Sequence, residues 1–459
     1  KLYALDKAEI EKRGIDLTRQ EELANELEKE FAAKSDFFAQ VSGRKTITWK
    51  DIQARLKPGE AAVEIIRFNP YQSDTIGSSV YIALILSPQT KAFPSGLSLG
   101  TDKELEGKSF SYFINSVKHK LKDENSYAKY WAPLKAGLEK EGAISKVYLS
   151  ADGVYNKISM NALQNPASGQ FLSDEIDIHL VSNTKILAEK KTSLVAKNKR
   201  CELYGFPDYS SSVATGAEEI PVVAANRNTI DTLSRYFKGG VIADLPATET
   251  EVKEISGILK GKGMDAQIYL RKEASEERLK NTESPLVLHI ATHGFFMKDE
   301  EAGLQNGKAL SGDVLKLQQN PLLRSGLLLA GVANSFKQKN NENYFAREDG
   351  MFTAYEAMNL DLSKTELVVL SACETGLGEI RNGEGVYGLQ RALEISGARA
   401  ILMSLWTVND EATRELMVEF YKGWMETGNK REAFKKAQQK LKEKYKDPYY
   451  WAAFVLMGE

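Results

Sequence analysis

The chain has 459 residues, too many for one ordinary core, so we expect two or more packed units. It is 42% hydrophobic and 27% charged, with Lys+Arg 61 nearly balancing Asp+Glu 63, which is typical of a globular protein. The net charge of -2 argues against direct binding to nucleic acid or anionic lipid, and no apolar run is long enough to span a bilayer. The two cysteines, Cys201 and Cys373, favour a reducing, cytoplasmic location, and a bridge between them stays open.

The first predicted unit, residues 1–57, is a helical lead-in. Apolar residues recur at helical spacing among dense charges over 8–40. Thr48 and Asp51 could then cap a short helix that stops at Pro58. Because the chain starts without Met inside a helical pattern, we expect this unit to be the end of a truncated helical repeat region.

The second predicted unit, residues 58–200, alternates strands with helices. Strands are expected at 62–67, 80–86, 146–150 and 176–181, and helices at 103–121 and 126–138. A polar, Lys-rich stretch at 189–199 marks its end. The alternation predicts an α/β fold with a largely parallel sheet.

The third predicted unit, residues 201–459, repeats the alternation. Strands are expected at 203–206, 266–270, 285–291, 326–329, 367–371 and 398–405, and helices at 248–259, 385–396, 409–425 and 430–444. A polar insertion at 297–349 surrounds one of these strands, and its stretch 337–343 is expected to be a loop. The basic residues at 435–446 are interpreted as a solvated helix face.

Two strands of this third unit end in reactive side chains. One runs into His293-Gly294 and the other into Cys373. The space beyond the carboxyl ends of neighbouring parallel strands is where ligands bind, so a thiol and an imidazole placed there can meet. His289 is expected to have a core or supporting role, because it lacks the partners of a metal site.

This pairing predicts covalent catalysis. A nearby imidazole raises the thiolate fraction of Cys373 and can later protonate the leaving amine. The backbone N–H groups of Gly294 and Cys373 could stabilise the oxyanion. A lone Cys at a strand end is more often an inert buried residue, but the paired His293 favours the catalytic interpretation. We expect neither a metal nor a cofactor.

These segments resemble the CHAT family, a caspase-like domain often found after tetratricopeptide repeats. The resemblance covers roughly Pro58 to the end and is carried by His289-Ile-Ala-Thr-His293-Gly294, Ser371-Ala-Cys373-Glu-Thr-Gly376, Asp349-Gly-Met-Phe-Thr-Ala-Tyr-Glu356, Gly383-Glu-Gly-Val-Tyr-Gly388, Ser404-Leu-Trp406-Thr-Val-Asn-Asp410 and Pro448-Tyr-Tyr-Trp451-Ala-Ala-Phe454. It implies a caspase-like, mostly parallel sheet flanked by helices in two related lobes. The first lobe would be degenerate and the second catalytic, with Cys373 as nucleophile and His293 as general acid/base.

The resemblance also suggests a substrate-binding segment that begins at Ser404 and pairs with the substrate backbone. Trp406 could wall the pocket for the residue before the cleaved bond. Asp410 or Glu384 could then attract Arg or Lys there. The alternative is that Asp410 only caps the helix that begins at this point.

Other functions fit the sequence less well. Gly383-Glu-Gly-Val-Tyr-Gly388 matches a dinucleotide-binding pattern, but it does not directly follow a strand. Ser98, between two glycines, formally resembles a nucleophile elbow without the strand that should deliver it. The serious alternative is a non-catalytic interaction scaffold that keeps the fold. We favour a peptidase that acts on a protein substrate and is held inactive until a partner or the upstream repeats act, with 297–349 as a movable cover.

Overall fold

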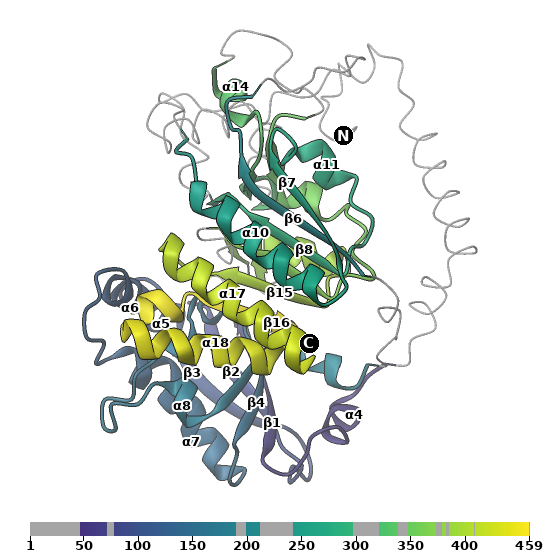
Figure 1. Cartoon of the computed structure of the whole chain (residues 1–459). Coiled ribbons are helices and arrows are strands. Elements are labelled where there is room, and N and C mark those ends of the chain that lie inside the picture. Colours follow the sequence, from purple (N-terminus) through teal and green to yellow (C-terminus); the bar gives the residue numbers. More distant parts are fainter. Residues whose placement is uncertain are drawn as a thin grey trace, which may run out of the picture.

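A computed structural model describes residues 46–70, 78–189, 199–211, 242–296, 321–337, 348–372, 379–381, 385–407 and 409–458. In this part of the chain, one 11-stranded sheet has the order β3-β2-β1-β4-β5-β16-β15-β12-β8-β6-β7 (Figure 1). Its strands are β1 (Glu60–Phe68), β2 (Val80–Leu86), β3 (Ser95–Thr101), β4 (Lys146–Ser150), β5 (Asp177–Val181), β6 (Arg200–Pro207), β7 (Asp265–Arg271), β8 (Val287–Ala291), β12 (Leu367–Leu370), β15 (Ala400–Ser404) and β16 (Phe454–Gly458). The expected helix at 8–40 lies outside the described residues, as does most of the expected loop at 337–343.

The sheet has two halves whose parallel strands run in opposite directions. β1, β4 and β5 are mutually parallel, and so are β15, β12, β8, β6 and β7. β16 lies between the halves, parallel to β5 and antiparallel to β15. The carboxyl ends of β8, β12 and β15 therefore lie at one edge, and those of β4 and β5 at the opposite edge.

Arg431 reinforces the junction of the two halves. β5 and β16 pair through Met457 opposite Leu180. The Arg431 guanidinium donates to the Leu180 carbonyl at 2.8 Å and also to the carbonyl of Gly458. One side chain thus bonds to the backbone of both strands, which compensates for their short pairing.

Helices cover the sheet. The α-helices are α4 (Trp49–Gln53), α5 (Asp102–Leu105), α6 (Lys108–Lys118), α7 (Ala132–Lys140), α8 (Leu172–Glu175), α10 (Pro246–Gly261), α11 (Glu276–Lys280), α14 (Val332–Lys337), α15 (Ala354–Ala357), α16 (Leu389–Ile395), α17 (Asp410–Thr427), α18 (Lys430–Tyr445) and α19 (Pro448–Trp451). Shorter or irregular turns are η2 (Tyr127–Trp131), η3 (Gly153–Lys157), η4 (Met160–Ala162), η5 (Thr184–Leu187) and η7 (Pro321–Leu323). Figure 1 shows α10, α17 and α18 side by side over one face of the sheet.

Most expected elements are confirmed, with two corrections. The helix expected at 103–121 is divided into α5 and α6, because Gly107 between them adopts a φ of +61° that interrupts a helix. The helix expected from Gly385 begins at Leu389, and Gly385–Tyr387 instead forms β14, which pairs with β13 (Glu379–Arg381). A glycine-rich start disfavours helix, which explains the later beginning.

A small second sheet begins directly after β8 in the chain. β9 (His293–Phe296) pairs with β10 (Ser325–Leu328), which pairs with β11 (Met351–Thr353). In this register His293 lies opposite Leu328. A described part of the 297–349 insertion is therefore directly paired with the strand that begins at His293.

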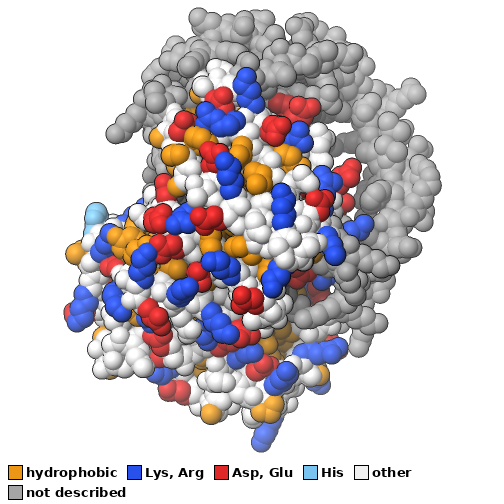
Figure 2. All heavy atoms as spheres, in the orientation of Figure 1, with side chains coloured by type: hydrophobic (Ala, Val, Ile, Leu, Met, Phe, Trp, Pro, Cys, Tyr) orange, Lys and Arg blue, Asp and Glu red, His pale blue; other side chains and the backbone are white. Residues whose placement is uncertain are grey.

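The basic stretch of α18 is an ion-paired surface. Figure 2 shows Lys and Arg side chains interspersed with Asp and Glu on this face. Lys435 lies 3.3 Å from Asp177, and Lys440 lies 2.7 Å from Glu419. The interpretation of 435–446 as a solvated helix face agrees with these pairs.

Candidate functional site

The two reactive segments follow neighbouring parallel strands. β8 and β12 pair in register, with Ile290 opposite Leu370. The N–H of Ser371 then donates to the Ile290 carbonyl at 2.9 Å, so the alignment continues to the end of β12. His293 follows β8 at this edge, and Ala372 follows β12. Cys373 and Glu384 lie outside the described residues.

The surroundings of His293 fix its tautomer. Its Nε2 lies 2.8 Å from the carbonyl oxygen of Ala243, in the segment before α10. A carbonyl can only accept, so Nε2 carries the proton and the neutral ring has its basic nitrogen at Nδ1. Burial lowers the pKa of His293, an effect partly offset by the Ala243 carbonyl and the charge of Asp410. A neutral imidazole at ordinary pH is what a general base requires.

Ala243 could not be identified from the sequence. Its contribution is a backbone carbonyl, which every residue has, and it comes from a segment 50 positions before His293. No side-chain pattern signals such a contact. It depends on how the segment before α10 lies against His293.

Gly294, the expected oxyanion donor, lies in β9. It is opposite Leu327 of β10, and in the described residues β9 is an edge strand of the small sheet. Cys373, the second expected donor, is outside the described residues. The oxyanion assignment therefore stays a prediction.

Ser404 and Trp406 are both fully buried. The Ser404 hydroxyl donates to the carbonyl of Ala372, directly before Cys373. The Trp406 indole N–H donates to the Tyr449 carbonyl at 3.1 Å, and its ring packs edge-on against Phe113. Both side chains are engaged within the protein, and their roles in substrate binding stay predictions.

Asp410 is the exposed first residue of α17. The helix cap is Asn409, whose side chain accepts from the N–H of Ala412 at 3.0 Å, so the alternative role of Asp410 as the cap is wrong. The charge of Asp410 raises the pKa of His293. This carboxylate therefore lies within electrostatic range of the candidate catalytic histidine.

Cys201 is unsuited to be the nucleophile. It is a free, buried thiol near the start of β6, opposite Val287. His293 follows the other end of the neighbouring strand, β8. Burial raises the pKa of Cys201 to about 12, which keeps it protonated and unreactive.

His289 has the expected core role. It is fully buried, and its Nε2 lies 2.9 Å from Glu251 Oε1 of α10. Its Nδ1 lies 3.2 Å from the Tyr421 hydroxyl of α17. These contacts fasten two covering helices to β8. Among the described residues, no group of three or more His, Cys, Asp or Glu side chains could hold a metal ion.

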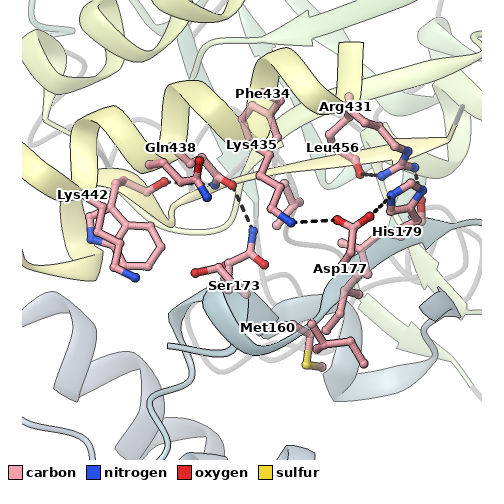
Figure 3. Close-up of a pocket in the computed structure, with 18 residues that line it drawn as sticks. Met160, Ser173, Asp177, His179, Arg431, Phe434, Lys435, Gln438, Lys442 and Leu456 are labelled. Carbon is pink, nitrogen blue, oxygen red and sulfur yellow. Dashed lines mark hydrogen bonds and ion pairs between the residues drawn. The ribbon is translucent and has the colours of Figure 1, made fainter. Parts of the chain in front are cut away.

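A pocket lies between β5 and α18, away from the carboxyl ends of β8 and β12 (Figure 3). Asp177 lines it and lies between Lys435 and His179, 3.3 Å from Lys435 Nζ and 2.9 Å from His179 Nε2. Phe434 adds an apolar side to its lining. Because its charged groups pair with one another, we interpret the pocket as a polar contact region between the two halves of the sheet.

Comparisons with known proteins identify the family. The model of the CHAT domain matches residues 125–459, which crosses the boundary predicted at 200 and begins later than the resemblance from Pro58. Human tetratricopeptide repeat protein 28 is 22% identical over 339 residues, covering 71% of this chain and 12% of that protein. Its mouse counterpart is 31% identical over 112 residues, covering 24% of this chain and 4% of that protein. The chain thus spans a small part of these relatives.

Two solved structures show a weak overall likeness. The Arg-specific cysteine proteinase gingipain R is 12% identical with a TM-score of 0.40, over 78% of this chain and 75% of that one. A Saccharomyces cerevisiae separase–securin complex is 12% identical with a TM-score of 0.43, over 89% of this chain and 30% of that one. In the described part, no helix is long and apolar enough to cross a membrane. The CHAT match covers most of the sequence, and the chain belongs to the CHAT domain family.

Proposed function

We propose that this chain is a cysteine endopeptidase in which Cys373 is the nucleophile and His293 the general acid/base. The observation that carries the proposal is the parallel pairing of β8 with β12, since it brings His293 and Ala372, the residue before Cys373, to one edge of the sheet. Ala372, bonded directly to Cys373, is held at that edge by Ser404. The buried Cys201 is a poor nucleophile, because burial raises its pKa.

The proposed reaction has two stages. Nδ1 of His293 takes the thiol proton, and the thiolate forms a bond to the carbonyl carbon of the peptide. The tetrahedral intermediate collapses, the C–N bond breaks, and the imidazolium protonates the leaving amine. Water, deprotonated by His293, then attacks the thioester carbonyl carbon. The C–S bond breaks, the carboxylic acid product leaves, and the imidazolium returns the proton to the Cys373 thiolate.

The sheet halves suggest different roles. The parallel strands β1, β4 and β5 end at the edge opposite His293, so the half formed by 58–200 would be a degenerate caspase-like lobe, and 201–459 would be the catalytic lobe. Asp410 near His293 favours substrates with Arg or Lys before the cleaved bond. The pairing of β9 with β10 offers a route by which an activating partner or upstream repeats could act on the site. We further propose a cytoplasmic protein substrate.

A peptide library tests the proposal. The wild type is incubated alone and with candidate activators, beside Cys373→Ala, His293→Ala and the control Cys201→Ala. We expect cleavage by the wild type and by Cys201→Ala, and loss of at least about a thousandfold in the two dyad variants. Cleavage that survives in Cys373→Ala would reject the dyad. No cleavage by any form would favour the non-catalytic scaffold.

A further inference from the structure

Tyr209 packs beside the imidazole of His293. It follows β6 in the chain, and its side chain is 3% exposed. The two ring centroids are 5.5 Å apart, with the planes inclined by 40°. Close packing of this kind restricts rotation of the imidazole.

The Tyr209 hydroxyl belongs to a chain of hydrogen bonds with a fixed direction. The Thr292 hydroxyl donates to the carbonyl of Leu328, which can only accept. Its single proton is thereby used, so the Tyr209 hydroxyl, 3.0 Å away, donates to Thr292 Oγ1. Thr292 directly precedes His293 in the chain. Two buried hydroxyls therefore connect Tyr209 to β10 through the residue before His293.

The backbone of Tyr209 is anchored on the insertion. Its carbonyl accepts from the N–H of Ala333 in α14 at 2.9 Å. The preceding carbonyl, of Asp208, accepts from the N–H of Gly331 at 3.0 Å. The backbone of Tyr209 is thus bonded to the segment after β10. Its ring packs against the imidazole of His293, and its hydroxyl bonds to Thr292.

We infer that Tyr209 is a positioning residue for His293, fixing both its backbone and the plane of its imidazole. The inference rests on the proposed peptidase function. Tyr209 acts through His293 and would take no part in bond making. Since its anchor is the segment after β10, displacement of that segment would also tilt the imidazole.

Tyr209→Phe tests this inference, because it removes one oxygen and keeps the ring. We expect kcat for peptide cleavage to fall roughly tenfold to a hundredfold at unchanged KM, since a misplaced catalytic group slows chemistry without weakening ground-state binding. The matched control is Tyr204→Phe. Tyr204 is also a buried tyrosine, and its hydroxyl donates to Glu202 at 3.1 Å, so it loses a similar hydrogen bond and should keep its kcat.

Thr292→Val breaks the same chain at its next link. If Tyr209→Phe fails to fold, this variant alone decides by the same fall in kcat. If both fold, the double variant should lose little more than either single variant, because the two changes act on one connected chain. Losses that multiply fully would overturn the inference.

A second readout does not require peptidase activity. The chain has 4 histidines, so the imidazole signal of His293 can be assigned in an NMR titration by comparison with His293→Gln. In Tyr209→Phe the pKa of His293 should move toward its ordinary value as water reaches the ring, and in Tyr204→Phe it should stay. An unchanged titration together with an unchanged kcat overturns the inference. A wild type without Cys373-dependent cleavage rejects the proposed function instead, while the titration still decides the role of Tyr209.

Discussion

The hydroxyl of Ser404, at the end of β15, donates a hydrogen bond to the carbonyl oxygen of Ala372, just beyond β12. Ser404 is fully buried, so the bond is shielded from water. It joins two neighbouring strand ends at the point where the chain enters Cys373. Ser404 therefore has a structural role that does not depend on contact with a substrate.

Ser404→Ala should therefore reduce peptide cleavage more than it reduces stability. We expect kcat to fall by about tenfold, because the end of β12 loses a fixed point, and the free energy of unfolding by about 1 kcal/mol. Ser396→Ala is the control, since the Ser396 hydroxyl at the C-terminal end of α16 donates to the Leu393 carbonyl at 2.9 Å. It should lose similar stability and keep kcat. Equal kcat values in both variants would contradict this role of Ser404.

Asp410 provides a test of substrate preference. The wild type should cleave peptides with Arg or Lys before the scissile bond faster than peptides with Ala there. Asp410→Asn should lower kcat/KM for the basic substrates by about tenfold and leave the Ala substrate unchanged, because only the basic side chains lose a charged partner. Equal or better cleavage after Asp would show that the predicted preference is wrong.

The same substitution should change the pH dependence of the site. The negative charge of Asp410 raises the pKa of His293, so its removal in Asp410→Asn should lower that pKa. The acid limb of the kcat/KM profile should then shift to lower pH, and the shift should shrink at high salt because Asp410 is exposed. Glu411→Gln is the control, since Glu411 pairs with Arg414 at 2.6 Å. A shift of the same size in Glu411→Gln would count against a specific effect of Asp410.

Local signals predicted much of the fold. The capping pair Thr48 and Asp51 does begin α4, with a hydrogen bond of 2.8 Å from the Thr48 N–H to Asp51. The strand before His293 was also recognisable, because an apolar run buried on both faces differs from its polar surroundings. Such features depend on neighbours in sequence, and the sequence contains them.

The features that could not be predicted from the sequence depend on contacts between residues far apart in the chain. β16, with 5 residues, is too short to distinguish from the end of a helix by periodicity, and its position between β15 and β5 comes from pairing alone. The same holds at the candidate site. The strand ends before His293 and Cys373 were predictable, whereas Ala243 and Tyr209 reach His293 from segments whose placement no local pattern encodes.

His289 should be important for stability. His289→Ala removes the partner of Glu251, which is 2% exposed, and leaves a buried carboxyl group without this hydrogen bond. We expect the free energy of unfolding to fall by about 3 kcal/mol in urea titrations. Glu251→Ala should cost a similar amount, and the double variant less than the sum, because both changes break one contact. A loss in His289→Ala below about 1 kcal/mol would contradict this structural role.

Lys280 lies among several carboxylates at the end of the insertion. Its ammonium is 2.8 Å from Glu356 and 3.5 Å from Glu348, and it also contacts the buried Glu276. Burial, reinforced by the neighbouring charge of Glu356, raises the pKa of Asp349 to about 7. The carboxylates therefore outnumber the positive charges around Lys280. Ionising all of them at once would cost free energy.

The cluster predicts that stability falls as the pH rises toward neutrality. The pKa of Asp349 is higher in the folded chain, about 7, than the value of about 4 expected for an unfolded chain, so the folded state binds more protons between these values. The stabilisation is complete below about pH 4 and is lost as the pH approaches 7. Asp349→Asn, which cannot ionise, should flatten this decline by at most about 4 kcal/mol, because each pKa unit corresponds to about 1.4 kcal/mol. Urea titrations between pH 4 and 8 would measure it, with the exposed Asp361→Asn as control, and parallel declines in wild type and Asp349→Asn would refute the prediction.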